Sequence, residues 1–562
     1  MIIKLNTFKG QNKMYPAYAM PIELGQQAIN TYIEDGTLTP MKNSTYFYLE
    51  DDVYVPTGTK GIYKHKNVNT DEYEWHFFNS KTNVVRHPVG SDIHQRIYFV
   101  EDGKLKYKRY AWPEVYDAIA PQPNPQNQLT VDISDGGTGD ITRFIAFTLV
   151  NNLGEETALS LTTSGTDNYL YGNYYITGLT ETSNITVTWD ENLIVPGGGY
   201  YDTWVKIRFY MTPVTTQSED YKFAGEAYIS SQNITIKNAG TDLSIAENVS
   251  SPVRLTYDDY TTVTLRGVCK TSFGSIITWD AANIYISDMK HPYCFSALST
   301  YSIESEILSI NPFGTSFLVS TTTSPYVLTG TDPTAMITEK AEQARGCLNK
   351  DCIVDMDSFI CVPTDEGIYK IGTGVFELAT KSMFTSASWK RIIGDGAYLV
   401  EATQYKNLYL LYLSTGNTLV FDFINGFFWE LDYEIRCGYY DKLEQKLYYT
   451  IDGVPDTRLL VFNNADNAYI YNVKTYSYKT GKIMLNTPVN FKYVRVFADS
   501  YVGSITINAY DSGILKFSRD ISSDDIVKIP SIRFNEAEIE IVSNVVINFI
   551  NISTTLEEML GA

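Results

Sequence analysis

The chain has 562 residues, a formal net charge of −21, 44% hydrophobic residues and 14% aromatic residues. The hydrophobic fraction excludes wholesale disorder, and the negative balance excludes a protein that binds nucleic acid by neutralising phosphates with clustered Lys and Arg. The 44 Tyr and 26 Phe favour β-sheet, because aromatic side chains fit a pleated, half-buried surface.

The first 15 residues, MIIKLNTFKGQNKMY, contain no apolar run of signal-peptide length. No segment approaches the roughly 18 apolar residues of a membrane-spanning helix, so we expect no membrane span. The six Cys form no CxxC pair, which predicts reduced, half-buried thiols, as expected for a protein made in cytoplasm.

Residues 1–41 are predicted to form an N-terminal arm, with one short helix over residues 24–32 (LGQQAINTY). From residue 42 to 124, short strands alternate with turns. Residues 96–110 (RIYFVEDGKLKYKRY) predict a hairpin, because Asp102 and Gly103 tolerate the positive φ of its turn.

Residues 121–128 (PQPNPQNQ) predict a linker, since closely spaced Pro residues stiffen the chain and remove hydrogen-bond donors. Residues 125–250 then predict a separate β-sandwich. Its strands are expected at residues 144–150, 184–189 and 204–211, with turns at 151–154 and 196–199.

Residues 251–481 predict further hairpins, of which residues 408–431 are the most complete. There, two strands flank a turn at residues 414–417, and a third strand follows Gly426. Residues 313–333 likewise contain strands separated by turns and end in SPYVLTGTDP. Repeated three- to four-stranded units of this kind are typical of propeller blades.

Residues 482–562 predict a last β region that closes the fold, with strands at 493–497, 504–510, 537–542 and 545–552. Helical periodicity is scarce throughout the chain. Residues 334–345 have a composition compatible with a helix, and a non-helical segment fits them equally well. The sequence therefore predicts an all-β protein.

Several short motifs, in order over about 500 residues, resemble the tail nozzle (tail tubular or tail hub) proteins of short-tailed bacteriophages. Each motif consists of turn and strand residues, and their order makes the match specific. They are residues 26–40 (QQAINTYIEDGTLTP), 144–156 (FIAFTLVNNLGEE), 206–210 (KIRFY), 283–293 (NIYISDMKHPY), 324–333 (SPYVLTGTDP), Gly346 with Cys347, and 529–541.

The resemblance implies a β-propeller with an inserted immunoglobulin- or fibronectin-like β-sandwich. It implies a virion structural protein of the tail, a homo-oligomer of six copies that forms a ring below the portal and its head-to-tail adaptor. Such a ring retains double-stranded DNA, conducts it during genome ejection without binding it specifically, and anchors tail fibres or spikes. An acidic wall suits this role because it offers DNA no counterion-releasing contacts.

The sequence predicts no enzyme, no cofactor and no metal site. The five His residues are expected in turns and on the surface, because they show neither HExxH nor H-x3-H spacing; they are His65, His76, His87, His94 and His291. No GxSxG, Walker or dinucleotide motif occurs. The sialidase Asp-box is also absent, although some propellers are glycosidases.

Two groups of charged residues have either a structural or a functional interpretation. Asp355 and Asp357 alternate in an expected strand and could together meet a cation. Lys104, Lys106 and Lys108 share one face of a strand. They are interpreted as a charged edge that prevents aggregation, or alternatively as a contact with an acidic neighbouring subunit or with DNA.

A different class of function is a host-surface glycan-binding propeller, an adhesin of a phage tail. In that case exposed aromatic residues such as Tyr200, Tyr201 and Trp204 would stack on sugars. A trimer in solution and a clear hit on a glycan array would favour this alternative.

Overall fold

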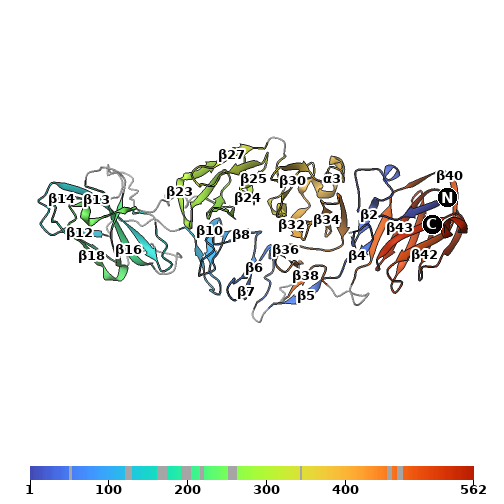
Figure 1. The fold of residues 1–562 in the computed structure, drawn as a ribbon, viewed down its shortest axis with the longest axis horizontal. Coiled ribbons are helices and arrows are strands. Elements are labelled where there is room, and N and C mark those ends of the chain that lie inside the picture. Colours follow the sequence, from blue (N-terminus) through green and yellow to red (C-terminus); the bar gives the residue numbers. More distant parts are fainter. Residues whose placement is uncertain are drawn as a thin grey trace.

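The computed structural model describes residues 1–561 except 34, 50–52, 120–128, 158, 161–173, 191–203, 215–220, 251–262, 342–344, 452–457 and 465–472. The protein is almost entirely β-structure and is elongated (Figure 1). A β-sandwich lies at one end, a ring of small sheets in the middle, and a second β-rich unit with both chain termini at the other end. No helix in the described part is long and apolar enough to cross a membrane.

The ring is a β-propeller, with six antiparallel blades of four strands among the described residues. The first blade is β8–β11 (Val84–Arg86, Ile97–Glu101, Lys104–Lys108, Val115–Asp117), and the second, after the inserted sandwich, is β20–β23 (Gly267–Lys270, Ile276–Trp279, Asn283–Asp288, His291–Ser302). The third is β24–β27 (Ile307–Phe313, Ser316–Thr321, Tyr326–Thr329, Ile337–Lys340), and the fourth is β28–β31 (Val354–Asp355, Ile360–Pro363, Ile368–Gly372, Val375–Leu378). The fifth is β32–β35 (Leu399–Tyr405, Leu408–Leu413, Thr418–Asp422, Phe427–Leu431).

The sixth blade closes the ring with a strand from the beginning of the chain. It consists of β36 (Cys437–Asp441), β37 (Lys446–Thr450), β38 (Arg458–Val461) and β5 (Thr45–Tyr48), and β5 lies antiparallel to β38. A two-stranded hairpin, β6 (Gly61–Lys66) and β7 (Tyr73–Phe78), occupies the ring between this blade and β8–β11 (Figure 1).

The blades are apolar on both faces because neighbouring blades cover them. All six residues of β33 are buried. Leu408, Leu410 and Tyr412 belong to one apolar cluster, and the alternate residues Tyr409 and Leu411 belong to another. This alternation follows from the period of two along a strand, and it explains why the sequence LYLLYL contains no polar residue.

The inserted sandwich consists of two sheets that pack around an aromatic core. One sheet contains β12 (Leu129–Ile133), β15 (Ile185–Trp189) and β18 (Asn233–Ile236). The other contains β14 (Tyr174–Leu179), β13 (Ile141–Asn151), β16 (Trp204–Met211), β17 (Lys222–Tyr228) and β19 (Ala246–Ser250). Phe147, Trp189 and Phe209 meet between the sheets, with ring centroids 5.8 to 6.2 Å apart.

The terminal unit joins both ends of the chain. Its strands are β1 (Ile2–Leu5), β2 (Gly25–Ile29), β39 (Tyr476–Thr480), β40 (Ile483–Ala498), β41 (Ile505–Asp511), β42 (Ile514–Asp520), β43 (Val527–Ser543) and β44 (Ile547–Ser553). The first half of β43 pairs with β40, and its second half pairs with β39 and β41. β1 pairs with β44, and β2 pairs with β39 on one side and with β35 of the propeller on the other.

The remaining elements are short. They are the strands β3 (Thr31–Tyr32) and β4 (Thr39–Pro40), the helices α3 (Ser386–Ile393) and α4 (Leu556–Leu560), and the 3-10 turns Ala17–Ala19, Ile229–Ser231, Asp242–Ser244, Lys350–Cys352 and Gly394–Gly396. The sequence prediction missed α3, which begins with a capping box between Thr385 and Ser388.

The expected all-β propeller with an inserted sandwich is confirmed, and so is the hairpin at Asp102 and Gly103. The helix predicted over residues 24–32 is wrong. That segment forms β2 and β3, because its backbone pairs with β39 and buries Ala28 completely. Residues 337–340 form the strand β27, so the helical alternative for residues 334–345 is also wrong. The linker at 121–128 and the turn at 196–199 lie outside the described residues.

The pairing of β1 with β44 gives a prediction for stability. Leu5 is 2% exposed and lies opposite Ile550, whereas the neighbouring Lys4 is exposed. We expect Leu5→Ala to lower the free energy of unfolding of the terminal unit by about 2–5 kcal/mol, because it leaves a cavity in a packed core. Lys4→Ala is the control in the same strand, and equal losses from both variants in denaturant titrations would contradict this role of β1.

Candidate functional site

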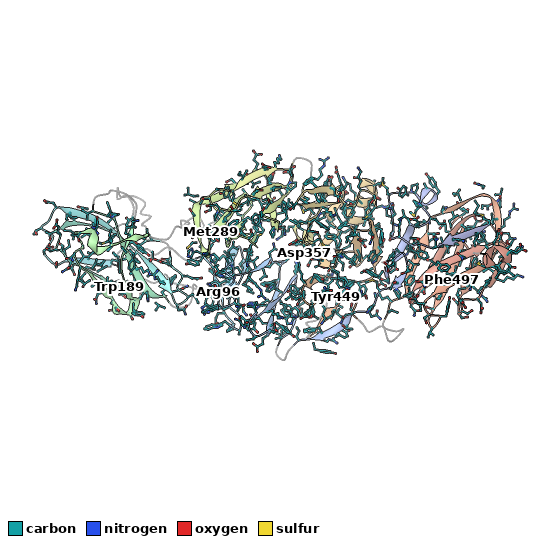
Figure 2. The ribbon with its side chains drawn as sticks, in the orientation of Figure 1. Arg96, Trp189, Met289, Asp357, Tyr449 and Phe497 are labelled. Carbon is teal, nitrogen blue, oxygen red and sulfur yellow. The ribbon has the colours of Figure 1, made fainter. Side chains whose placement is uncertain are left out.

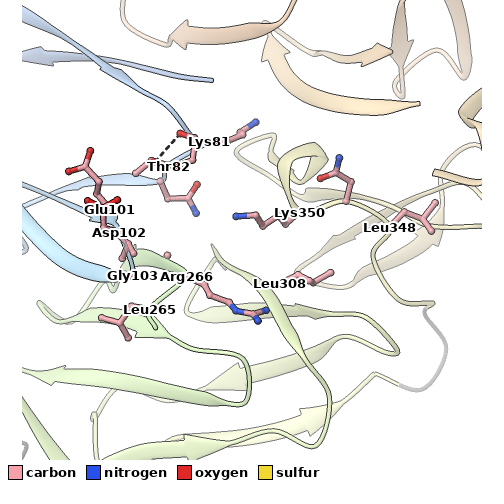
Figure 3. A pocket seen from close by; sticks show the side chains of 15 residues that line it. Lys81, Thr82, Glu101, Asp102, Gly103, Leu265, Arg266, Leu308, Leu348 and Lys350 are labelled. Carbon is pink, nitrogen blue, oxygen red and sulfur yellow. Dashed lines mark hydrogen bonds between the residues drawn. The ribbon is translucent and has the colours of Figure 1, made fainter. Parts of the chain in front are cut away.

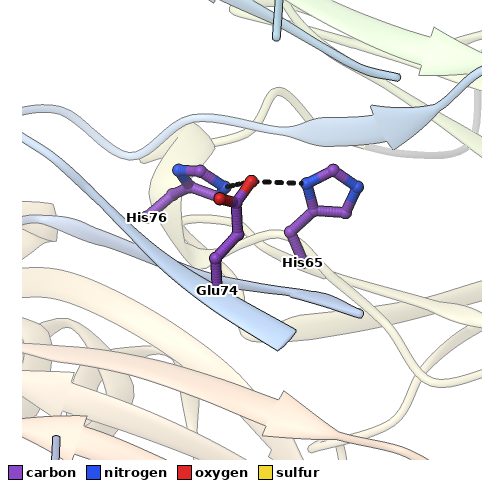
Figure 4. A group of neighbouring side chains, drawn as sticks. All are labelled: His65, Glu74 and His76. Atoms are coloured by element: carbon purple, nitrogen blue, oxygen red, sulfur yellow. Dashed lines mark hydrogen bonds and ion pairs between the residues drawn. The ribbon is translucent and has the colours of Figure 1, made fainter. Parts of the chain in front are cut away.

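Two histidines and a carboxylate meet on the hairpin β6–β7 (Figure 4). His65 lies directly opposite Glu74 in the strand register, and His76 lies two residues farther along β7 on the same face. His65 Nδ1 is 3.1 Å and His76 Nε2 is 3.0 Å from the same oxygen, Glu74 Oε1. The expectation that the histidines lie at the surface is wrong for His65, whose side chain is 1% exposed, and for His87, which is also buried.

Burial and hydrogen bonds have opposite effects on the pKa of the Glu74 carboxyl. Burial favours a neutral Glu74, but hydrogen bonds from His65 and His76 outweigh it and hold the pKa of this carboxyl well below its usual range. Burial also lowers the pKa of His76. The Lys108 ammonium, from strand β10 of the blade β8–β11, lies 3.2 Å from Glu74 Oε1. The group is therefore a carboxylate shared by two imidazoles and an ammonium.

Sequence reasoning missed this group because it searched for spacings typical of helices and zinc fingers. On two antiparallel strands, ligands meet when a residue of one strand lies opposite a residue of the other, and the third ligand lies two residues farther along on the same face. The segments YKHK (residues 63–66) and YEWH (residues 73–76) flank a turn and contain this signal. Their register becomes known only once the hairpin is formed.

A cavity of about 510 Å³ lies where loops of the ring converge (Figure 3). Lys81, Arg266 and Lys350 line it together with Glu101 and Asp102. The cavity contains more cationic than acidic side chains, although the whole chain carries a charge of −21.

Two of these cations are engaged within the protein. Lys81 Nζ lies 3.1 Å from Glu401 Oε1 and also donates to backbone carbonyls of Asp351 and Ala402. Burial alone would lower the pKa of Lys81, but attraction to the Glu401 carboxylate has the larger effect and raises it. Arg266 pairs with Glu306 at 2.6 Å. These contacts tie loops and blades together, which is a structural role.

The three lysines of β10 meet carboxylates of their own chain. Lys104 pairs with Asp117, Lys106 with Glu101, and Lys108 with Glu74. The interpretation as a protective sheet edge is wrong, because β10 lies between β9 and β11 and is not an edge strand.

Asp355 and Asp357 do not share a strand. Asp355 ends β28, whereas Asp357 has a φ of 68° in the following turn. The cation that Asp357 meets is the Lys442 ammonium, and Gln404 Nε2 donates to the same carboxylate at 3.2 Å. The structure thus brings an aspartate and a lysine together here, not two aspartates around an ion.

The predicted aromatic platform is absent at Trp204, which is buried with 8% exposure at the beginning of β16. Tyr200 and Tyr201 lie outside the described residues. Exposed tyrosines occur instead on the edge strand β5, where Tyr46 is 55% and Tyr48 is 68% exposed. The glycan-binding alternative therefore loses the one platform residue that the structure describes.

The six Cys are thiols, as predicted, but all of them are buried and not half-buried. Burial raises the pKa of Cys347 to about 12, so its reactive thiolate form is suppressed at neutral pH. Cys347 also donates to a backbone carbonyl. These residues fill the core and offer no nucleophile.

A buried ion pair joins the inserted sandwich to the propeller. Arg96, at the beginning of blade strand β9, contacts Glu155, which follows β13, and it also contacts Asp92 at 3.1 Å. Arg96 lies on the side of the blade that faces the sandwich (Figure 2). Each of the three side chains is at most 8% exposed, so removing one would leave a buried charge without its partner.

His87 lies next to this ion pair and is 8% exposed. Its Nδ1 accepts a hydrogen bond from the backbone N–H of Val89 at 3.1 Å. Burial, reinforced by the nearby Arg96 charge, lowers the pKa of His87 to about 4.

Comparisons with known proteins place the chain in no established family. No family model matches the sequence, and no curated protein matches it. Among solved structures it is similar to the computationally designed Ika8 protein (8% identity, 78% of this chain and 99% of that chain, TM-score 0.29). It is also similar to BamB from Moraxella catarrhalis, with 8% identity over 76% of this chain and 99% of that chain and a TM-score of 0.32. The Pan2 WD40 domain from Neurospora crassa has 8% identity over 51% of this chain and 85% of that chain, with a TM-score of 0.27. TM-scores this low carry no argument, so the fold assignment rests on the blades of this chain.

The environment of His87 gives a pH prediction. Its pKa is about 4 in the folded protein and 6.5 when unperturbed, so the unfolded chain binds more protons between these values. Stability from a neutral His87 is therefore complete above pH 6.5 and is lost as the pH falls toward 4, by up to about 1.4 kcal/mol per pH unit. His87→Asn keeps an acceptor for Val89 and removes the titration.

The test measures melting temperature against pH for both proteins. Other acid-sensitive groups titrate equally in the two, so the difference isolates His87. We expect the wild type to lose stability more steeply than the variant between pH 6.5 and 4. Parallel curves would show that protonation of His87 is not coupled to folding.

Proposed function

We propose that the chain is a structural subunit of the tail of a short-tailed bacteriophage, in which six copies form a ring below the portal and its adaptor. The observation that carries this proposal is the insertion of a β-sandwich between two propeller blades: β12–β19 follow β11 and precede β20. This combination is the one that the resemblance to tail nozzle proteins implies. The function is passive, as the wall of a channel.

In this proposal the genome passes between propellers and not through one. A cavity of about 510 Å³ in the ring is too small for a DNA duplex, and Lys81 reaches across to β32 beside it. The proposed lumen therefore lies between neighbouring copies. The net charge of −21 per copy supports a surface that DNA slides past, because 65 acidic residues outnumber the 44 Lys and Arg that could hold phosphates.

The strand β5 supports lateral contact between copies. It is the outer strand of its blade, and no described strand pairs with its free edge. Edge strands are usually protected by charges or Pro, yet β5 reads TYFY and exposes Tyr46 and Tyr48. Tyrosines contribute strongly to protein interfaces. We therefore place a contact with a second copy at this edge.

The inserted sandwich supports a contact with fibres or spikes. It lies at the far end of the elongated body, away from the terminal unit that contains both chain ends (Figure 1). The buried ion pair between Arg96 and Glu155 fixes it to its blade. A partner attached to the sandwich is thereby held at a set position relative to the ring.

Assembly tests the proposal directly. The purified chain is examined by mass photometry and electron microscopy, alone and mixed with the adaptor complex of the same phage. We expect closed rings of six copies, formed alone or on the adaptor. A strict monomer that never joins an adaptor ring contradicts the proposal, and a trimer that binds defined glycans on an array would support the adhesin alternative instead.

The edge of β5 gives a sharper prediction. We expect the double variant Tyr46→Ser, Tyr48→Ser to weaken self-association by more than about tenfold, because buried tyrosines at an interface commonly contribute over 1 kcal/mol each. Both side chains are exposed in the single chain, so the melting temperature of the monomer should change little. Tyr228→Ser is the matched control, since Tyr228 is 57% exposed on the inserted sandwich. Unchanged assembly of the double variant would place the contact elsewhere.

A further inference from the structure

The group of His65, Glu74 and His76 has the composition of a metal centre. Their ligand atoms all lie within 4.8 Å of one another. Two imidazole nitrogens and one carboxylate oxygen are the three protein ligands typical of zinc sites that keep a fourth position open. Mg²⁺ and Ca²⁺ prefer oxygen ligands throughout, so this set favours Zn²⁺ or a similar ion.

The geometry fits such an ion after a small adjustment. Both nitrogens lie 3.0 to 3.1 Å from Glu74 Oε1. Ligands about 2.0–2.2 Å from a tetrahedral ion are about 3.4 Å apart. Each nitrogen therefore needs to move only about 0.3–0.4 Å away from the carboxylate oxygen. The two nitrogens already lie within 4.8 Å of each other, so side-chain rotation on the hairpin can bring all three ligands around one ion.

The three ligands differ in how far they are exposed to solvent, and this difference suits metal binding. The His65 side chain is 1% exposed, and its ring packs edge-on against Tyr110 at 5.3 Å. The side chains of Glu74 and His76 are 23% and 13% exposed. One fixed ligand thus lies behind two that an ion can reach from solvent.

Lys108 is the group that a metal must displace. Its ammonium lies 3.2 Å from Glu74 Oε1 and supplies the positive charge that the carboxylate needs in the absence of a metal. Lys108 belongs to β10, whereas the three ligands belong to β6 and β7. Its long, flexible side chain can move to solvent when an ion takes over this charge.

The site lies on a hairpin that a bound ion would stabilise. A two-stranded hairpin is marginally stable alone. On one face of β6, Lys64 is bound to Asp441 and Glu444 of the closing blade. His65 points to the opposite face, toward β10. A metal would replace weak polar contacts by ligand bonds on that second face.

We propose that His65, Glu74 and His76 bind one Zn²⁺-class divalent ion, with water at the fourth position, and that this ion stabilises the hairpin β6–β7 where the propeller ring closes. The site is independent of the tail function proposed above.

The test uses the full chain, freed of metal with a chelator and titrated with Zn²⁺ and, as a spectroscopic probe, Co²⁺. We expect one equivalent per chain, the intense visible bands of tetrahedral Co²⁺, and a rise in melting temperature with Zn²⁺. Glu74→Gln and His76→Ala should weaken binding by more than about 100-fold, since even substitutions around metal ligands cost about 10–100-fold. His291→Ala is the control, because His291 also pairs with a carboxylate but is 52% exposed elsewhere.

Lys108→Gln separates a metal site from a simple hydrogen-bonded group. If Lys108 competes with the ion, this variant should bind Zn²⁺ more tightly than the wild type, while its metal-free form melts lower. A wild type that binds no stoichiometric metal, or binding that survives both Glu74→Gln and His76→Ala, would overturn the proposal. His291→Ala should bind Zn²⁺ as tightly as the wild type does, and a loss as large as that of His76→Ala would also contradict the assignment of the ligands.

Discussion

The antiparallel pairing of β5 with β38 holds the propeller together, because it joins the beginning of the ring to its end. Leu459 lies opposite Phe47 across this seam, and Phe47 packs against Trp75 and Tyr448 with ring centroids 5.8 and 5.2 Å apart. Without this strand the sixth blade would have an open apolar edge, and the two-stranded hairpin would lose its neighbour. The seam therefore depends on residues about 400 positions apart in sequence, so the ring cannot close until most of the chain has been made.

A second long-range closure connects the propeller to the terminal unit. The N-terminal arm adds β1 to β44 and β2 to β39, and β2 also bridges to β35 of the propeller. Hydrogen-bonded backbone thus continues from a blade into the terminal sheets. A continuous sheet resists bending better than two units that touch only through side chains, which would suit the proposed channel wall.

Local features of the fold could be predicted, and long-range pairings could not. Strands such as β33 and the turn at Asp102 and Gly103 follow from alternation and from residues that adopt positive φ. The segment at residues 24–32 could not be recognised as a strand from its own sequence, because β2 forms by pairing with β39 and β35, about 400–450 residues away. The same limit applies to the candidate site, since the approach of His65 to Glu74 depends on hairpin register and that of Lys108 on packing of β10 against it.

The distribution of charge links these observations to assembly. Within the ring, Lys64, Lys81 and Arg266 are paired with carboxylates of the same chain, and the chain as a whole carries an excess of 21 negative charges. Copies of such a chain repel one another at low ionic strength, and salt screens this repulsion. Attraction between copies must then come from groups that carry no charge, and the exposed Tyr46 and Tyr48 on an unpaired edge are of that kind. In the proposed ring, the acidity that would let DNA pass also favours contacts between copies through strand edges and aromatic side chains over ion pairs.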